Sequence, residues 1–144
     1  MNSVLPDIVV VRANGATNYD GIAVKLTFFM NVKNNFAYLA FLNPEGVAEI
    51  KKSEYLAEFD KDCNFFIMDY TNPRSVFSGK IEAKILTESE LKSAIKTYES
   101  FCNHFPYSDG YRERLEKALA VLDTLKNDGG GKLSITVEQR ELGG

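Results

Sequence analysis

The amino-acid sequence predicts an α+β fold: an antiparallel β-sandwich with an appended helical hairpin and a C-terminal strand. Apolar residues alternate with small or polar ones through much of 7–86, which is the two-residue period of half-buried strands. The period changes to three and four residues over 88–126, as in amphipathic helices. Strands grouped together and helices grouped together are typical of the α+β class.

The first part of the chain contains six strand-like runs separated by turn signals. We expect these strands at 7–12, 22–30, 36–42, 47–50, 63–70 and 78–86. Asn43-Pro44-Glu45-Gly46 is the strongest turn, because proline presets φ and glycine accepts a positive φ. The run at 63–70 is too apolar for an edge and is predicted to be a central strand. Ser53 is predicted to cap a short helix that extends through Phe59.

Two helices and a last strand follow. Thr87 and Glu90 have the spacing of a capping box, which predicts a helix that ends before Pro106. The apolar stripe of this helix is predicted to be Leu91, Ala94, Ile95, Tyr98, Phe101 and Cys102. The second helix is predicted to start at Ser108-Asp109-Gly110, with an apolar face of Leu115, Ala118, Leu119, Leu122 and Leu125. A flexible run at 129–131 precedes the strand expected at 132–138.

Length and composition limit the function classes. We expect residues 1–144 to form a single domain, with the sandwich at 7–86, the hairpin at 88–126, and a strand and tail at 132–142. The net charge of -3 and the scattered basic residues argue against nucleic acid as a partner. No signal peptide or membrane-length apolar run is recognised, so we expect a cytoplasmic protein without membrane contact. Cys63 and Cys102 are then reduced thiols, unless the fold brings them close enough for a disulfide.

The order of turns and strands over 7–86 resembles the transthyretin-like or carboxypeptidase-regulatory-like sandwich. The resemblance rests on a first strand ending at Asn14-Gly15, on Gly21 before the strand Ile22–Leu26, and on Asn43-Pro44-Glu45-Gly46-Val47 leading into a strand. It implies a non-catalytic module that binds or stabilises a neighbouring protein. The helical hairpin at 88–126 departs from the plan of that family.

The string Leu142-Gly143-Gly144 follows the last strand-like run directly. Glycine has no Cβ, so such a tail fits a narrow channel. Together with Leu133, Val137 and Arg140, the string is similar to the end of ubiquitin. The resemblance implies a ubiquitin-like modifier, whose Gly144 carboxylate is adenylated by an activating enzyme and passed to a thiol and then an amine. The alternative is an ordinary chain end. The C-terminal half also lacks the opening hairpin of that family.

A polar loop follows the predicted strand at 63–70. Asp69, Tyr70, Asn72 and Arg74 put a carboxylate, a phenol, an amide and a guanidinium at a strand end, which is a common arrangement for binding a partner. The simpler interpretation, which we favour, is that Asp69 and Asn72 stabilise the turn and Arg74 pairs with Asp69.

The sequence predicts no catalytic residue, metal site or cofactor. His104 and Cys102 are two residues apart on a predicted helix and point about 200° away from each other, so we expect His104 to cap the helix end instead. An acidic cluster lacks the glycine and the closing glutamate of a calcium loop and is predicted to face water. It consists of Glu54, Glu58, Asp60 and Asp62.

The leading hypothesis is therefore a non-enzymatic module that binds other proteins. The second is a ubiquitin-like modifier with activating and conjugating enzymes as its partners, and an enzyme is the third. Edge strands near the N-terminus or at 132–138 can add to a neighbouring sheet, so the sequence also predicts that the chain can form a homo-oligomer.

Overall fold

The structure is a computed structural model of the 144-residue chain. It describes residues 5–15, 19, 21–29, 35–55, 77–104, 106, 109–124 and 133–142. The predicted strand at 63–70 and residues 56–59 of the predicted short helix lie outside the described residues and stay predictions.

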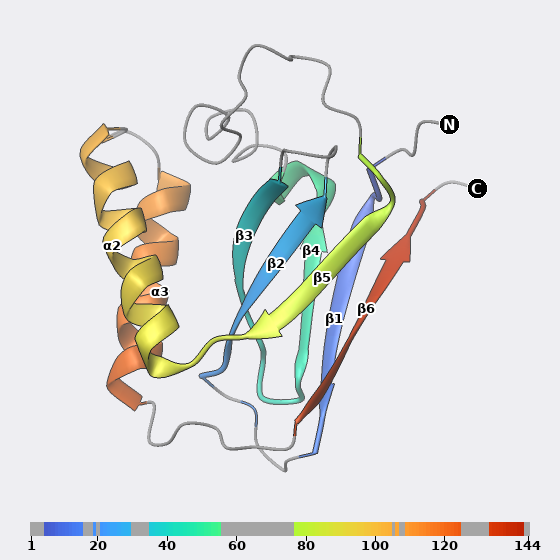
Figure 1. Cartoon of the computed structure of the whole chain (residues 1–144), viewed down its shortest axis with the longest axis horizontal. Coiled ribbons are helices and arrows are strands. Elements are labelled where there is room, and N and C mark those ends of the chain that lie inside the picture. The colour runs from blue at the N-terminus through green and yellow to red at the C-terminus, as the bar shows by residue number, and fades with distance from the viewer. Residues whose placement is uncertain are drawn as a thin grey trace.

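Two three-stranded antiparallel sheets form the β part of the fold (Figure 1). The first has the order β4-β1-β6, with β4 at Val47–Lys51, β1 at Ile8–Asn14 and β6 at Ser134–Arg140. The second has the order β3-β2-β5, with β3 at Asn35–Phe41, β2 at Ala23–Phe29 and β5 at Lys80–Ile85. The antiparallel sandwich with a C-terminal strand is confirmed, although β6 lies two residues later than predicted.

The main core lies between the two sheets and is filled by alternate residues of each strand. Val9 and Val11 of β1 face Val24, Leu26 and Phe28 of β2 across this core, and all five are fully buried. The two-residue period explains why these residues are the buried ones, because every second side chain of a strand points to the same face. Burial of each such side chain stabilises the fold by about 1.5–3 kcal/mol. The core is therefore set by the alternation visible in the sequence.

The turn between β3 and β4 joins the two sheets. Asn43 Oδ1 accepts hydrogen bonds from the N–H groups of Glu45 and Val47, both at 3.0 Å. Gly46 has a φ of +85°, and a Cβ there would lie 2.8 Å from the Tyr19 ring. The predicted turn is confirmed, and only glycine fits its last position without strain.

A short helix begins at residue 52, two residues before a helix capped by Ser53 would begin. Ser53 is therefore inside the first turn, and the prediction that it caps the helix is wrong. The Glu54 carboxylate instead accepts a hydrogen bond from the Lys51 N–H at 3.0 Å. The same turn places Tyr55 fully in the core, where its hydroxyl donates to the Pro6 carbonyl and its ring lies 4.6 Å from that of Phe28.

The helical hairpin consists of α2 at Glu88–His104 and α3 at Asp109–Thr124, packed antiparallel beside the second sheet (Figure 1). Its own core is built from Leu91, Ile95, Tyr98 and Phe101 of α2 with Tyr111, Ala118 and Val121 of α3. This core reaches Ala23 of β2 and Leu39 of β3, on the face of their sheet turned away from the main core. The sheet β3-β2-β5 is thus covered by β1 and its neighbours on one face and partly by helices on the other.

The predicted apolar face of α3 is wrong for one residue. Leu119 is 45% exposed, whereas Tyr111, which the stripe omitted, is fully buried between Tyr98 and Phe101. Leu115 and Leu122 are only partly buried. Among the described helices, none is long and apolar enough to span a bilayer.

Candidate functional site

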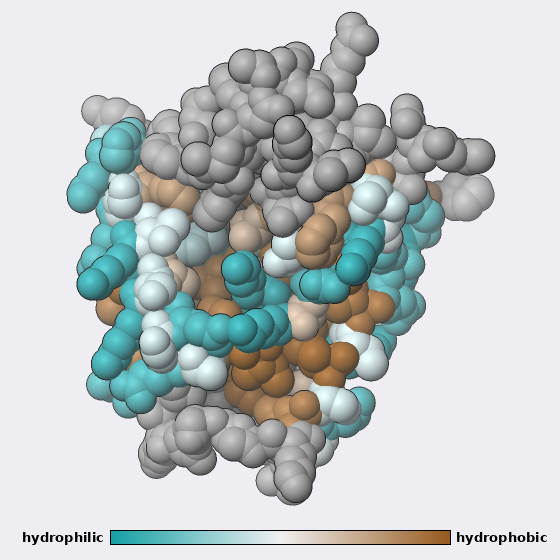
Figure 2. All heavy atoms as spheres, viewed as in Figure 1, coloured by the Kyte–Doolittle hydropathy of each residue, from teal (hydrophilic) through white to brown (hydrophobic). Residues whose placement is uncertain are grey.

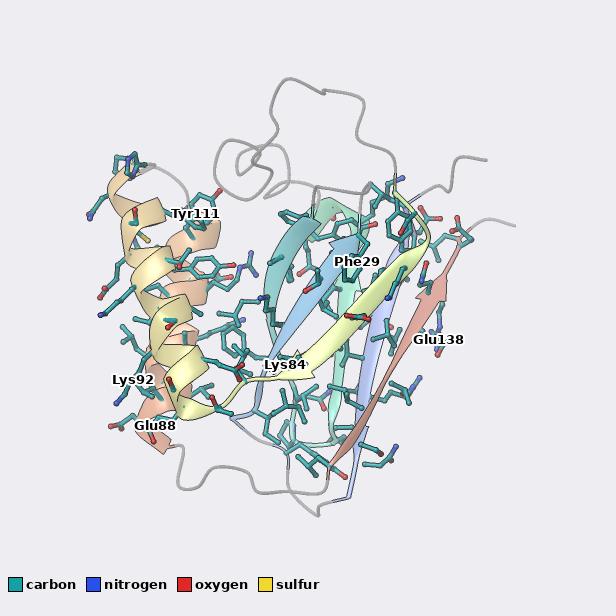
Figure 3. All side chains as sticks on the ribbon, viewed as in Figure 1. Phe29, Lys84, Glu88, Lys92, Tyr111 and Glu138 are labelled. Atoms are coloured by element: carbon teal, nitrogen blue, oxygen red, sulfur yellow. The ribbon has the colours of Figure 1, made fainter. Side chains whose placement is uncertain are left out.

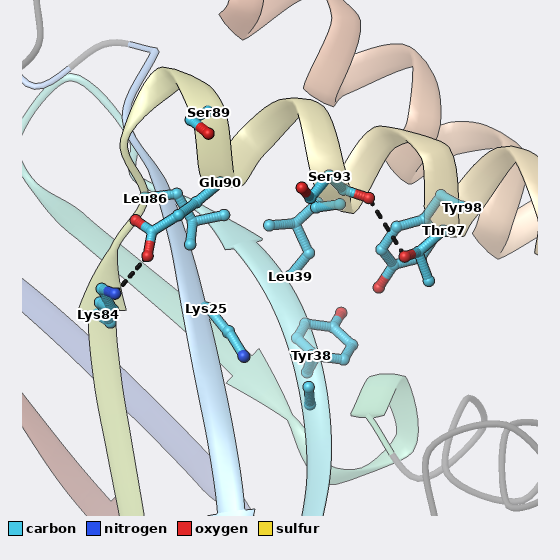
Figure 4. A pocket seen from close by; sticks show the side chains of 12 residues that line it. Lys25, Tyr38, Leu39, Lys84, Leu86, Ser89, Glu90, Ser93, Thr97 and Tyr98 are labelled. Atoms are coloured by element: carbon cyan, nitrogen blue, oxygen red, sulfur yellow. Dashed lines mark hydrogen bonds and ion pairs between the residues drawn. The ribbon is translucent and has the colours of Figure 1, made fainter.

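A groove of about 400 Å³ lies between α2 and the outer face of sheet β3-β2-β5 (Figure 4). The outer face is the one turned away from the main core. Its floor is apolar and consists of Ala37 and Leu39 of β3 with Leu86, and Ala94 adds an apolar side chain from the α2 wall. Hydroxyl groups and charges surround this floor, from Ser89, Ser93, Thr97, Lys25, Lys84 and Glu90. An apolar floor with a polar rim is the usual composition of a site that binds another molecule.

Helical spacing explains the row of hydroxyls on the groove wall. Ser89, Ser93 and Thr97 follow one another at four-residue intervals, so they lie on one side of α2. Leu91 and Ile95 lie on the adjacent side and hold the helix in the hairpin core. The Thr97 hydroxyl donates to the Ser93 carbonyl at 3.2 Å, whereas those of Ser89 and Ser93 are exposed at the groove mouth.

The start of α2 is held by the predicted capping box, which is confirmed. Thr87 Oγ1 accepts a hydrogen bond from the Glu90 N–H at 3.2 Å, and Glu90 Oε1 accepts one from the Thr87 N–H at 2.9 Å. The other carboxylate oxygen of Glu90 forms an ion pair with Lys84 of β5. The Lys84 hydrogen bond, followed by the Thr87 backbone N–H, lowers the pKa of Glu90 to about 2. These contacts fix the helix wall against the strand floor.

Two lysines of the groove differ in their partners. Lys84 lies between β5 and the start of α2, where Glu90 neutralises it (Figure 3). Lys25 of β2 stands opposite Lys84 in the ladder and points into the groove (Figure 4). Among the described residues, no carboxylate forms an ion pair with Lys25. The groove therefore carries one positive charge that its described surroundings do not balance.

A partly buried polar contact ties the β3 side of the groove to α3. Arg114 Nη1 donates a hydrogen bond to the Tyr38 hydroxyl at 2.7 Å, and the guanidinium lies 4.3 Å from the centre of the Tyr38 ring. Burial raises the pKa of Tyr38, although the charge of Arg114 opposes this shift. Burial also lowers the pKa of Arg114, and Tyr38 opposes that shift. Because the cation also packs on the aromatic ring, this contact helps to hold α3 of the hairpin against β3.

The residues that the sequence proposed for binding and conjugation cannot be placed. Asp69, Tyr70, Asn72 and Arg74 lie outside the described residues, and so do Gly143 and Gly144. Cys63 and three members of the acidic cluster, Glu58, Asp60 and Asp62, also lie outside them. Their predicted roles stay predictions.

The structure places His104 and Cys102 where the sequence expected them. His104 ends α2 with Nδ1 2.9 Å from the Ser100 carbonyl, which confirms the capping interaction. Cys102 is a half-buried free thiol, and burial raises its pKa, which disfavours the reactive thiolate. Within the described part of the chain, no three His, Cys, Asp or Glu side chains gather as a metal site would require.

The groove itself was missed by the sequence argument. The hydroxyl row at 89, 93 and 97 is visible in the sequence as a four-residue repeat beside the apolar stripe. Nothing local to Lys25 or Ala37 shows that α2 packs near them, because that contact joins residues more than fifty positions apart.

Comparisons of the chain with protein-family models, curated proteins and solved structures give no match.

Proposed function

We propose that the protein is a non-enzymatic interaction module that binds another protein in the groove between α2 and sheet β3-β2-β5. The observation that carries the proposal is the groove itself. Its apolar surface is accessible at the partly buried Ala37 and Ala94, above the buried Leu39 and Leu86, and its rim offers the hydroxyls of Ser89 and Ser93 and the charge of Lys25. Accessible apolar surface framed by hydrogen-bonding groups is typical of the centre and rim of a protein interface.

The groove walls belong to elements that are fixed independently of a partner. α2 is anchored by the hairpin core and by the capping box, and the floor strands are anchored by the main core. A preformed surface binds with little loss of conformational entropy. We also propose that the module acts in the cytoplasm, which agrees with the free thiol of Cys102.

Site-specific photo-crosslinking in the cells that make the protein tests this function. A benzophenone amino acid at Ser93 faces the groove, and the same amino acid at the exposed Lys117 of α3 serves as the control. We expect one discrete covalent adduct with another protein from position 93 and none from position 117. The same adducts from both positions, or none from position 93, contradict the proposal.

The second candidate is a ubiquitin-like modifier conjugated through Gly144 by partner enzymes. One observation favours it. β6 is paired with β1 as far as Arg140, and Leu142 beyond the strand is 64% exposed, so the chain leaves the fold at an accessible point. Asp7 Oδ2 accepts a hydrogen bond from the Leu142 N–H at 2.7 Å and holds this exit in place. Mass spectrometry of cellular adducts is the test. Adducts that survive deletion of Gly143 and Gly144 rule this candidate out.

A further inference from the structure

The sandwich is open in its hydrogen bonding on the side where β5 and β6 meet: the two strands approach each other, but among the described residues their backbones are not paired. Within the described part of the chain, these strands are the edges of the two sheets, each paired on one side only, to β2 and to β1 respectively. Between them the described residues show a single hydrogen bond, from Gln139 Nε2 to the Gly79 carbonyl at 3.1 Å. On the opposite side the turn at 43–46 closes the sandwich. Free strand edges carry unpaired backbone N–H and C=O groups.

Apolar side chains remain accessible along this open side. They are only partly buried and pack against the main core from its margin: Ile81, Ala83, Ile85, Leu133, Ile135 and Val137. A hollow of about 530 Å³ runs along β5, bounded by Ile81 and Ala83 on one side and by Ile135 and Val137 on the other. Figure 2 shows apolar residues on this face of the molecule, crossed by a band of hydrophilic side chains.

The charges next to the hollow are balanced with one exception. On β5, Lys80 pairs with Glu82 at 3.0 Å, and Lys84 pairs with Glu90 of α2. Lys25 lines this hollow as well as the groove, and no carboxylate of the described residues pairs with it. A ligand that carries a carboxylate matches this site electrostatically.

We infer that β5 takes up an extended segment of a partner protein as an additional strand, with a carboxylate of that segment next to Lys84 and in the field of Lys25, which lies one strand further in on the same face. An unpaired strand edge is recognised by another extended backbone, which supplies the complementary row of donors and acceptors. Alternate side chains of the added strand then cover Ile81 and Ala83, and the others lie on the lysine side of the sheet. This inference rests on the proposed function only in taking a protein as the partner.

Binding of synthetic peptides to the whole protein, followed by NMR of its backbone amides, tests the inference. The probe is a nine-residue peptide of alternating valine and threonine with a central aspartate. The control peptide is identical except for a lysine at the centre. We expect the aspartate peptide to bind about tenfold more tightly than the lysine peptide, since a cross-strand attraction replaces a repulsion. Lys25→Glu should reverse this preference. Lys117→Glu, on the exposed face of α3, should leave it unchanged.

Two further peptides separate strand addition from ordinary side-chain contact. Each is the aspartate peptide with N-methyl groups at every second residue. One version is methylated along one side of the extended peptide and the other version along the opposite side, so each peptide loses the N–H donors of one side. Strand addition requires at least one of them to lose binding, and it requires the β5 amides to become protected from hydrogen exchange.

Several results would overturn the inference. These are equal binding of methylated and unmethylated peptides, no binding at all, or shifts confined to the α2 wall at 89–97. Sedimentation showing a dimer that already protects β5 would assign the edge to a second copy of the chain instead. The crosslink from position 93 is measured separately, so loss of the strand site and loss of the proposed groove function give different results.

Discussion

Replacement of Thr87 and Glu90, one at a time, separates the two interactions that hold the start of α2. Thr87→Ala removes the acceptor for the Glu90 N–H, which lies 3.2 Å from Thr87 Oγ1. Loss of an N-cap side chain costs about 1 kcal/mol of unfolding free energy, and we expect that loss here at all pH values. Glu90→Gln keeps an oxygen to accept from the Thr87 N–H but removes the charge that pairs with Lys84.

The effect of Glu90→Gln depends on pH, and its sign follows from the pKa. The Lys84 hydrogen bond, together with the Thr87 N–H, lowers the pKa of Glu90 to about 2 in the folded protein. The carboxylate therefore stabilises the fold fully above the pKa of the unfolded chain, about 4.3, and this stability is lost as pH falls toward 2. Because the Glu90 side chain is 35% exposed and screened by solvent, we expect only about 1 kcal/mol from it.

Urea denaturation followed by circular dichroism at pH 7, 4.5, 3 and 2.5 measures this difference. We expect the stability of the wild type to exceed that of Glu90→Gln by about 1 kcal/mol at pH 7, and this gap to narrow steadily from pH 4.5 to pH 2.5. Glu88→Gln is the matched control, because Glu88 pairs at 3.2 Å with Lys92 on the side of α2 away from the sheet (Figure 3). A gap that persists at low pH, or an equal gap for Glu88→Gln, would refute the reasoning.

Four further substitutions test the packing. Gly46→Ala should cost about 2–3 kcal/mol, because its positive φ is unfavourable for alanine and its Cβ would meet Tyr19; an unchanged urea midpoint would contradict this. Phe28→Ala should cost about 3–5 kcal/mol in thermal unfolding, since Phe28 is fully buried, and a loss below about 1 kcal/mol would place it outside the core. Leu119→Ser should change stability by less than about 0.5 kcal/mol, whereas Val121→Ser on the buried side of the same helix should cost several times more.

The parts of the fold that the sequence predicts well are those with local signals. The alternation of Ile81, Ala83 and Ile85 places them on one face of β5, and the turn at 43–46 follows from its proline and glycine. The capping box at Thr87 forms as expected, because its two hydrogen bonds connect residues only three apart.

The parts that the sequence does not predict depend on contacts between distant segments. Tyr111 has a polar hydroxyl, so a hydrophobicity pattern passes over it, yet its ring fills the space between Tyr98 and Phe101. The groove depends on where α2 packs against β2 and β3, and no local spacing encodes that placement. The pairing of β1 with β6 likewise joins the two ends of the sequence, with Val11 opposite Val137.

The groove and the open edge of β5 share one ion pair, which makes their chemistry interdependent. β5 continues into α2 through Leu86 and Thr87, and Lys84 of the strand is neutralised by Glu90 of the helix. Glu90→Gln therefore leaves a second unpaired ammonium beside Lys25 while it weakens the start of α2. Since the inferred partner strand supplies a carboxylate at this point, the aspartate peptide should bind Glu90→Gln about threefold more tightly than the wild type at low salt. The gain should fade at 1 M salt, where the Debye length is about 3 Å. A weaker affinity for the variant at low salt would mean that the carboxylate does not lie beside Lys84.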